Sequence, residues 1–119
     1  MDTRNKIIAA EAAEDIARQC RAAGKAVTLV TGFFDPLLAA QARRLEQVAR
    51  TGGALFVAVQ DPDRPLLSAQ ARAELVAGLR VVDYVILGGT VAADAVFHEE
   101  AADRRRTQEL AQHVHDGQK

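Results

Sequence analysis

The stretch "TLVTGFFDPLLAAQARRLEQ", residues 28–47, decides the fold of this 119-residue chain. It opens with a continuous run of β-branched and apolar residues, which is typical of a strand buried on both faces of a parallel sheet. Gly32 then allows a sharp turn, and Asp35 followed by Pro36 is a favoured helix opening, because Asp caps free amides and Pro suits the first helical position. We therefore predict a strand over residues 26–31, a turn, and a helix from Pro36 to about Arg50.

The same alternation continues along the chain. The apolar runs "ALFVAV" (residues 54–59) and "DYVIL" (residues 83–87) predict two further buried strands. Between them Ser68 is placed to cap a helix over residues 69–80, with Leu75, Val76 and Leu79 on its buried face.

A helix over residues 5–23, ended by Gly24, precedes the first strand. A helix followed by strand-helix units predicts an α/β protein, a three-layer α/β/α Rossmann-like parallel sheet of three strands. The expected organisation is one domain over residues 1–119. It comprises an N-terminal helix (1–24), a βαβαβ core (26–89) and a charged helical tail (90–119), in which Val91, Ala95 and Val96 are assigned to a helical face.

Composition limits the classes of partner. The 15 Lys and Arg residues are balanced by 16 Asp and Glu residues, so no overall field attracts nucleic acid or an anionic membrane. Cys20 is the single cysteine, which excludes an internal disulfide. Neither a secretory apolar segment nor a run of transmembrane length is present in the sequence, and the expected location is the cytoplasm.

Two segments carry a resemblance to a known family. "GFFDPLLAAQARRL", residues 32–45, resembles the motif G-x-F-D-x-x-H-x-G-H and the R-x-L helix core of the nucleotidyltransferase superfamily with the cytidylyltransferase-like fold. The similar branch is that of heptose-phosphate adenylyltransferases and glycerol-phosphate cytidylyltransferases. "RPLLSAQARAELVAGLRVVDYVIL", residues 64–87, resembles a second segment of that family. The matching positions of the motif are Gly32, Phe34, Asp35, Arg43 and Leu45.

The resemblance implies a reaction that this sequence is poorly equipped to perform. In the family, the two motif histidines stabilise charge while a phosphate or alcohol attacks the α-phosphorus and pyrophosphate leaves. Those positions are Leu38 and Gln41 here, and the glycine between them is Ala40. Leu38 has no donor and Gln41 carries no charge. Because loss of one preorganised donor typically costs about 10²–10³ in rate, no catalytic residue is assigned.

The resemblance also implies a nucleotide site at the carboxyl ends of the strands, where ligands bind in open α/β sheets. ATP or CTP with Mg²⁺ are the candidate ligands, and no protein metal ligand is assigned. Asp35 has the alternative role of helix N-cap, and the two arginines that of exposed surface residues. The candidate nucleotide-binding residues are Thr31, Gly32, Phe33, Phe34, Asp35, Gln41, Arg64 and Arg72.

The C-terminal histidines do not form a recognisable metal motif. His98-Glu99 begins like H-E-x-x-H, but position 102 is Ala. His113 and His115 are two residues apart and so lie on different helix faces. The basic run at residues 104–106 follows several acidic residues, which favours a self-neutralised helix surface.

These observations leave three functional hypotheses. The first is a catalytically degenerate nucleotidyltransferase-like domain that binds a nucleotide or a protein; a truncated three-stranded sheet has open edges, which favours a homodimer or a partner protein. The alternative is a divergent Mg²⁺-dependent adenylyl- or cytidylyltransferase acting on a sugar or polyol phosphate, with Gln41, Arg64 and Arg72 replacing the histidines. The third is a scaffold whose turn binds no ligand.

Overall fold

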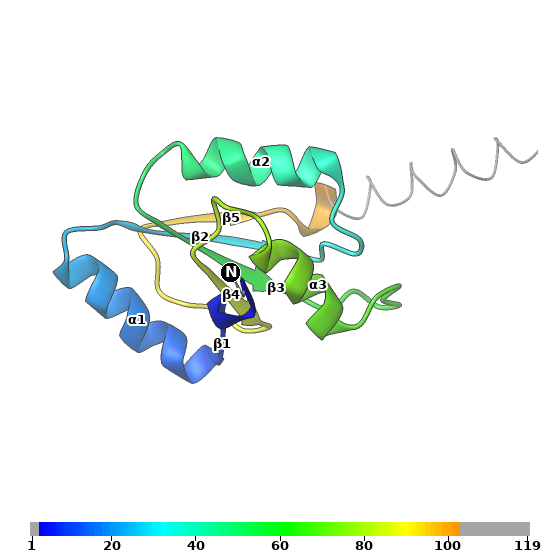
Figure 1. Ribbon diagram of the computed structural model, residues 1–119, viewed down its shortest axis with the longest axis horizontal. Helices are drawn as coiled ribbons and strands as arrows, with labels where there is room; N and C mark the ends of the chain where they lie inside the picture. The colour runs from blue at the N-terminus through cyan, green and yellow to red at the C-terminus, as the bar shows by residue number, and fades with distance from the viewer. Residues whose placement is uncertain (1–2, 103–119) are drawn as a thin grey trace, which may run out of the picture.

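A computed structural model describes residues 3–102, which form a five-stranded, wholly parallel sheet with helices on both faces (Figure 1). The strand order is β1-β4-β3-β2-β5. The elements are a 3-10 helix (Thr3–Lys6), β1 (Ile7–Ile8), α1 (Ala10–Ala22), β2 (Val27–Gly32), α2 (Ala39–Ala49), β3 (Ala54–Val59), α3 (Ala69–Ala77), β4 (Tyr84–Leu87) and β5 (Ala95–His98).

The centre of the sheet follows directly from the sequence. β2 and β3 pair over their full lengths, from Val27 opposite Ala54 to Gly32 opposite Val59. Every residue of both strands is buried, as expected for continuous apolar runs. The strands are parallel, so their carboxyl ends meet at one edge of the sheet, where the turn after β2 also lies.

Two apolar clusters, one on each face, attach the helices to the sheet. On one face Leu45 and Val48 of α2 and Val76 of α3 pack with strand residues such as Val30 and Val57. On the other face Ala13 and Ala17 of α1 pack against Leu29 and Phe56. α2 and α3 therefore cover one face and α1 the other, which confirms the predicted three-layer α/β/α architecture (Figure 1).

The expected number of three strands was wrong. Residues 7–8, predicted to be helical, form β1 and pair with β4. Residues 95–98, assigned to a helical tail, form β5 and pair with β2. Both strands are very short, and their backbone groups find partners only on strands distant in sequence. Tertiary pairing therefore overrides the helical spacing of their apolar residues.

Two predicted helices differ at their ends. α2 begins at Ala39 with Leu38 as its N-cap, so the assignment of Asp35 as N-cap and Pro36 as first helical residue was wrong. α3 ends at Ala77, and Leu75, predicted to be buried, is 46% exposed. The N-cap of α3 was predicted correctly, since the Ser68 hydroxyl accepts a hydrogen bond from the Ala71 amide at 3.1 Å.

Within residues 3–102 no helix has both the length and the apolar character needed to cross a membrane. The C-terminal predictions for His113, His115 and the basic run 104–106 fall outside the described residues.

Candidate functional site

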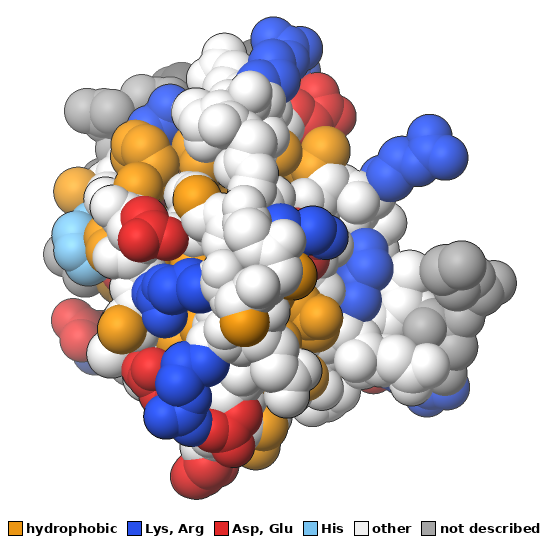
Figure 2. All heavy atoms as spheres, turned by 90° about the vertical axis from the view of Figure 1, so that its left-hand side faces the viewer, with side chains coloured by type: hydrophobic (Ala, Val, Ile, Leu, Met, Phe, Trp, Pro, Cys, Tyr) orange, Lys and Arg blue, Asp and Glu red, His pale blue; other side chains and the backbone are white. Residues whose placement is uncertain are grey.

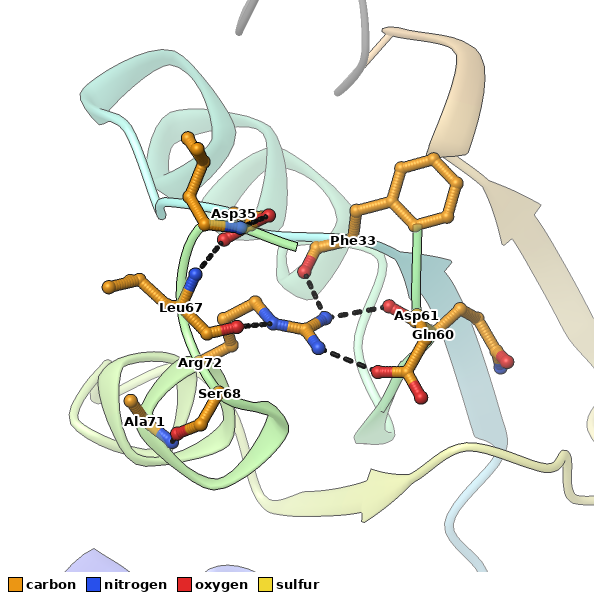
Figure 3. A network of polar contacts seen from close by, with 9 residues as sticks. Phe33, Asp35, Gln60, Asp61, Leu67, Ser68, Ala71 and Arg72 are labelled. Carbon is orange, nitrogen blue, oxygen red and sulfur yellow. Dashed lines mark hydrogen bonds and ion pairs between the residues drawn. The ribbon is translucent and has the colours of Figure 1, made fainter. Parts of the chain in front are cut away.

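The candidate site lies where β2 ends, at the point where the order of the strands reverses. β3 pairs with one side of β2 and β5 with the other, and the chain reaches these two neighbours through separate connections. In open α/β sheets the crevice at such a point, outside the carboxyl ends of the strands, is the usual ligand position. Residues 33–38 connect β2 to α2 here, and the loop after β3 lies beside them (Figures 1 and 3).

Asp35 connects two loops by hydrogen bonds and does not cap a helix. Its side chain is 5% exposed, and its two carboxylate oxygens accept hydrogen bonds from the amides of Leu66 and Leu67 at 2.6 and 2.8 Å. The carboxylate therefore fastens the loop that precedes α3 onto the turn that follows β2. Because this motif aspartate is already bonded to the backbone, its main observed role is structural.

Arg72 is the buried centre of the same network (Figure 3). Only 1% of the residue is exposed, although it lies on a helix where an exposed position was the sequence alternative. Nε donates to the Leu67 carbonyl at 3.1 Å, and Nη1 donates to the carbonyls of Phe33 at 3.1 Å and Gln60 at 2.8 Å. Nη2 donates to the Asp61 carboxylate at 2.6 Å. One guanidinium thus joins the end of β2, the end of β3 and the start of α3.

Gln41 stabilises the start of α2. The residue is 1% exposed, and its Oε1 accepts a hydrogen bond from the Leu38 amide at 2.6 Å. This is the reach of an N3 glutamine back to the N-cap amide, one half of a capping box. The polar side chain that replaces the second motif histidine is therefore engaged with its own helix.

Thr31 meets a residue that the sequence prediction did not include in the site. Thr31 and His98 are opposite each other at the ends of β2 and β5, and Thr31 Oγ1 lies 2.8 Å from His98 Nδ1. The next residue, Glu99, forms an ion pair with Arg44 of α2, whose Nε lies 2.5 Å from Glu99 Oε1. Arg44 Cζ also lies 5.4 Å from the centre of the Phe97 ring. These contacts hold the end of β5 against α2.

The remaining candidate residues have varied roles. Phe34 is a core residue, 1% exposed, with a φ of 51° that is uncommon for a residue other than glycine and reverses the chain tightly. Gly32 is the last residue of β2, and its carbonyl accepts from the Gln60 amide at 2.8 Å. Phe33 is half-buried, and Arg64 is exposed on the loop after β3. Phe33, Asp35 and Arg72 thus meet in one network.

Comparison with known proteins supports the family resemblance. The chain is 36% identical over 81 residues to the bifunctional protein HldE of Chromohalobacter salexigens, covering 60% of this chain. It is 32% identical over 92 residues to the bifunctional protein HldE of Syntrophotalea carbinolica, covering 70% of this chain. The lipopolysaccharide core biosynthesis protein from Thermoplasma volcanium matches in structure, with a TM-score of 0.52 and 29% sequence identity over 56% of this chain.

The chain has the cytidylyltransferase-like fold of the nucleotidyltransferase superfamily. This nucleotidyltransferase-like domain spans only 17% and 19% of the two HldE proteins and 60% of the structural neighbour. No protein-family model matches the sequence. The match therefore concerns the fold and the superfamily, and the activity of the domain is a separate question.

His98 is the residue at this edge of the sheet that sequence reasoning missed. The histidine was considered only as part of a metal motif, and β5 was not predicted. The signal was the short run Ala95–His98, in which valine and phenylalanine, both frequent in strands, lie next to each other. A strand there would have placed His98 at the same edge of the sheet as the turn after β2.

The face shown in Figure 2 does not carry a strongly charged patch. On the face shown in Figure 2, Lys and Arg side chains are interspersed with Asp and Glu side chains, with small apolar areas between them. Among residues 3–102, no group of three or more His, Cys, Asp or Glu side chains is placed to hold a metal ion.

Proposed function

We propose that this domain binds a nucleotide at the carboxyl edge of β2 without efficiently transferring its nucleotidyl group. The observation that carries the proposal is the state of the two histidine positions of the motif: Leu38 is an apolar N-cap, and Gln41 is buried with its Oε1 on the Leu38 amide. The turn, the helix start and the fold of a nucleotidyltransferase are kept, whereas both charged donors are replaced.

The proposed loss of nucleotidyl transfer is supported by the size of the rate loss that a missing donor causes. One missing preorganised donor lowers a rate by about 10²–10³, and effects of residues that act together need not add. Arg72 is poorly placed to compensate, because its guanidinium already donates to three carbonyls and one carboxylate. A phosphate would have to displace those contacts and loosen three segments.

Retention of binding is supported by the start of α2. Leu38 has no side-chain oxygen that could cap the helix, so the amides of Ala39 and Ala40 can donate hydrogen bonds to an anion, helped by the helix dipole. The carboxylate of Asp35 is bonded to the amides of Leu66 and Leu67, which reduces its repulsion of a phosphate. Mg²⁺ would arrive with the nucleotide, since this ion is commonly held by substrate phosphates.

Calorimetric titration with ATP and with CTP, each with Mg²⁺, tests the binding, and pyrophosphate release in the presence of sugar or polyol phosphates tests the transfer. Binding of one nucleotide without pyrophosphate release is the expected result. A ligand that binds the folded state must also raise the melting temperature. If neither nucleotide binds at millimolar concentration and neither raises the melting temperature, the proposal is refuted.

The alternative proposal is a divergent Mg²⁺-dependent adenylyl- or cytidylyltransferase acting on a sugar or polyol phosphate. The exposed Arg64, on the loop beside the site, is the charged side chain that favours it. Steady pyrophosphate release that falls in Arg64→Gln would establish this alternative. If only the donors are missing, the double variant Leu38→His, Gln41→His gains release from an inactive parent.

A homodimer is a further proposal, supported by the exposed edge of β5. β5 is the last strand of the sheet, and Val96 is 44% exposed. Edge strands present unpaired backbone groups that can pair with another chain. Sedimentation of the purified protein tests this: a dimer that dissociates in Val96→Lys supports pairing through β5, and a monomer at all concentrations refutes it.

A further inference from the structure

The pair formed by Thr31 and His98 joins a buried residue to an exposed one. Thr31 is 5% exposed in the centre of the sheet, whereas His98 is exposed at its edge. The two are register partners, and Thr31 Oγ1 lies 2.8 Å from His98 Nδ1. A rigid central strand thus holds one nitrogen of a surface imidazole.

This contact couples the Thr31 hydroxyl to the role of the other ring nitrogen. If the Thr31 hydroxyl donates to Nδ1, the neutral ring carries its proton on Nε2; if the ring is cationic, both nitrogens carry protons. Nε2 is a hydrogen-bond donor in both of these states, and it is an acceptor when a neutral ring instead donates from Nδ1 to the Thr31 oxygen. Since the two nitrogens are on opposite sides of the ring, Nε2 is directed away from Thr31. The only partner of the ring among the described residues is Thr31.

His98 lies at the edge of the sheet where ligands bind in open α/β folds. β2 and β5 are the neighbouring strands at which the strand order reverses. Because they are parallel, His98 at the end of β5 lies at the same edge of the sheet as the turn after Gly32. Its acidic neighbour Glu99 is paired with Arg44, whose guanidinium also lies over Phe97. The negative charge next to the imidazole is therefore balanced within the fold.

We propose that His98 binds a phosphate group of the nucleotide through Nε2, and that Thr31 is its positioning residue. The inference rests on the proposed function and deepens it: the imidazole lost from the α2 motif is replaced, for binding, by one supplied from β5. The ligand class is a nucleoside triphosphate. No covalent step is involved.

Titration with ATP·Mg²⁺ and CTP·Mg²⁺ tests this assignment in four variants of the full chain. In His98→Asn the amide oxygen can keep the contact with Thr31 but reaches no further, so affinity falls about 10- to 100-fold, the value of one hydrogen bond to a charged group. His98→Gln, which extends a donor towards the Nε2 position, stays within about threefold of the wild type.

Thr31 is tested in the same titration. Thr31→Val removes the hydroxyl at nearly constant shape and weakens binding about 3- to 10-fold, whereas Thr31→Ser restores it. The imidazole ¹⁵N chemical shifts of His98 report the change of tautomer in Thr31→Val, a readout that a merely structural role would not move.

The two proposals fail in different ways. If the wild type binds a nucleotide and His98→Asn binds it equally well, the role of His98 is refuted and nucleotide binding stands. If the wild type binds neither nucleotide, the proposed function fails and this inference fails with it. Because His98 is exposed, its variants should melt at the temperature of the wild type, which separates lost binding from lost folding.

Discussion

Replacing Arg72 by alanine should destabilise the domain by about 4 kcal/mol. Three carbonyl oxygens, those of Leu67, Phe33 and Gln60, would lose their donor. At about 1 kcal/mol each, the lower end for buried groups because loop carbonyls can be partly rehydrated, they contribute about 3 kcal/mol. Loss of packing by the buried aliphatic part of the side chain adds about 1 kcal/mol.

The ion pair itself should contribute little of this effect. The side chain of Asp61 is 73% exposed, so the carboxylate is well solvated without its partner. Exposed pairs are worth about 0–1 kcal/mol. Asp61→Asn is therefore the matched control, with an expected loss below about 1 kcal/mol, and Arg72→Lys should fall between the two because a point charge cannot reach all the carbonyls.

Urea unfolding followed by circular dichroism measures these differences. With a slope of about 1.5 kcal/mol per molar urea, a loss of about 4 kcal/mol lowers the midpoint by about 2–3 M. If Arg72→Ala fails to fold, Arg72→Lys still provides a measurable shift. An Arg72→Ala midpoint equal to that of Asp61→Asn would refute the view that the carbonyl contacts, and not the ion pair, give Arg72 its importance.

Three further changes test other parts of the structure. Asp35→Ala should cost about 1–3 kcal/mol and speed hydrogen exchange of the Leu66 and Leu67 amides by NMR, because both lose their acceptor; unchanged exchange at these amides would contradict the role of Asp35. Gln41→Ala should cost about 0.5–2 kcal/mol in thermal unfolding, since Leu38 loses its capping partner, whereas the exposed Gln47→Ala should be neutral; equal effects would count against the cap. Gly53→Ala should cost at least about 1–2 kcal/mol in urea unfolding, because φ is +84° and the new Cβ would lie 2.5 Å from the Ala26 carbonyl oxygen, while Gly52→Ala meets no atom within 4 Å and should cost less; the reverse order would refute the steric reason.

The parts of the fold that sequence predicted best are those where local pattern and tertiary environment agree. β2 and β3 are continuous apolar runs, and the structure buries every residue of both. β1 was missed because it has only two residues, and β5 was missed because its four residues, unlike those of the equally short β4, are mostly exposed and lack a longer apolar run. Their identity depends on pairing with β4 and β2, which no local pattern reveals.

The candidate site was predicted in place but not in detail. Asp35 before Pro36 fits a helix cap, yet its acceptors serve Leu66 and Leu67, more than thirty residues away in the chain. The role of Arg72 was equally hard to predict. Its partners include backbone carbonyls, which every residue has and which no sequence pattern identifies. Polar residues that bind the backbone of distant segments are therefore recognised only once the fold is known.

Because β5 lies far along the chain from β2, the site can form only late during synthesis of the chain. On the ribosome β2 and β3 can pair once the first half of the chain has emerged, but Thr31 meets His98 only after 67 further residues. Because β5 is a short edge strand, we expect it to open more readily than β2, β3 and β4. The stability of the site is thus expected to depend on an edge strand. A ligand bound to both β2 and β5 would therefore stabilise the pairing of these two strands.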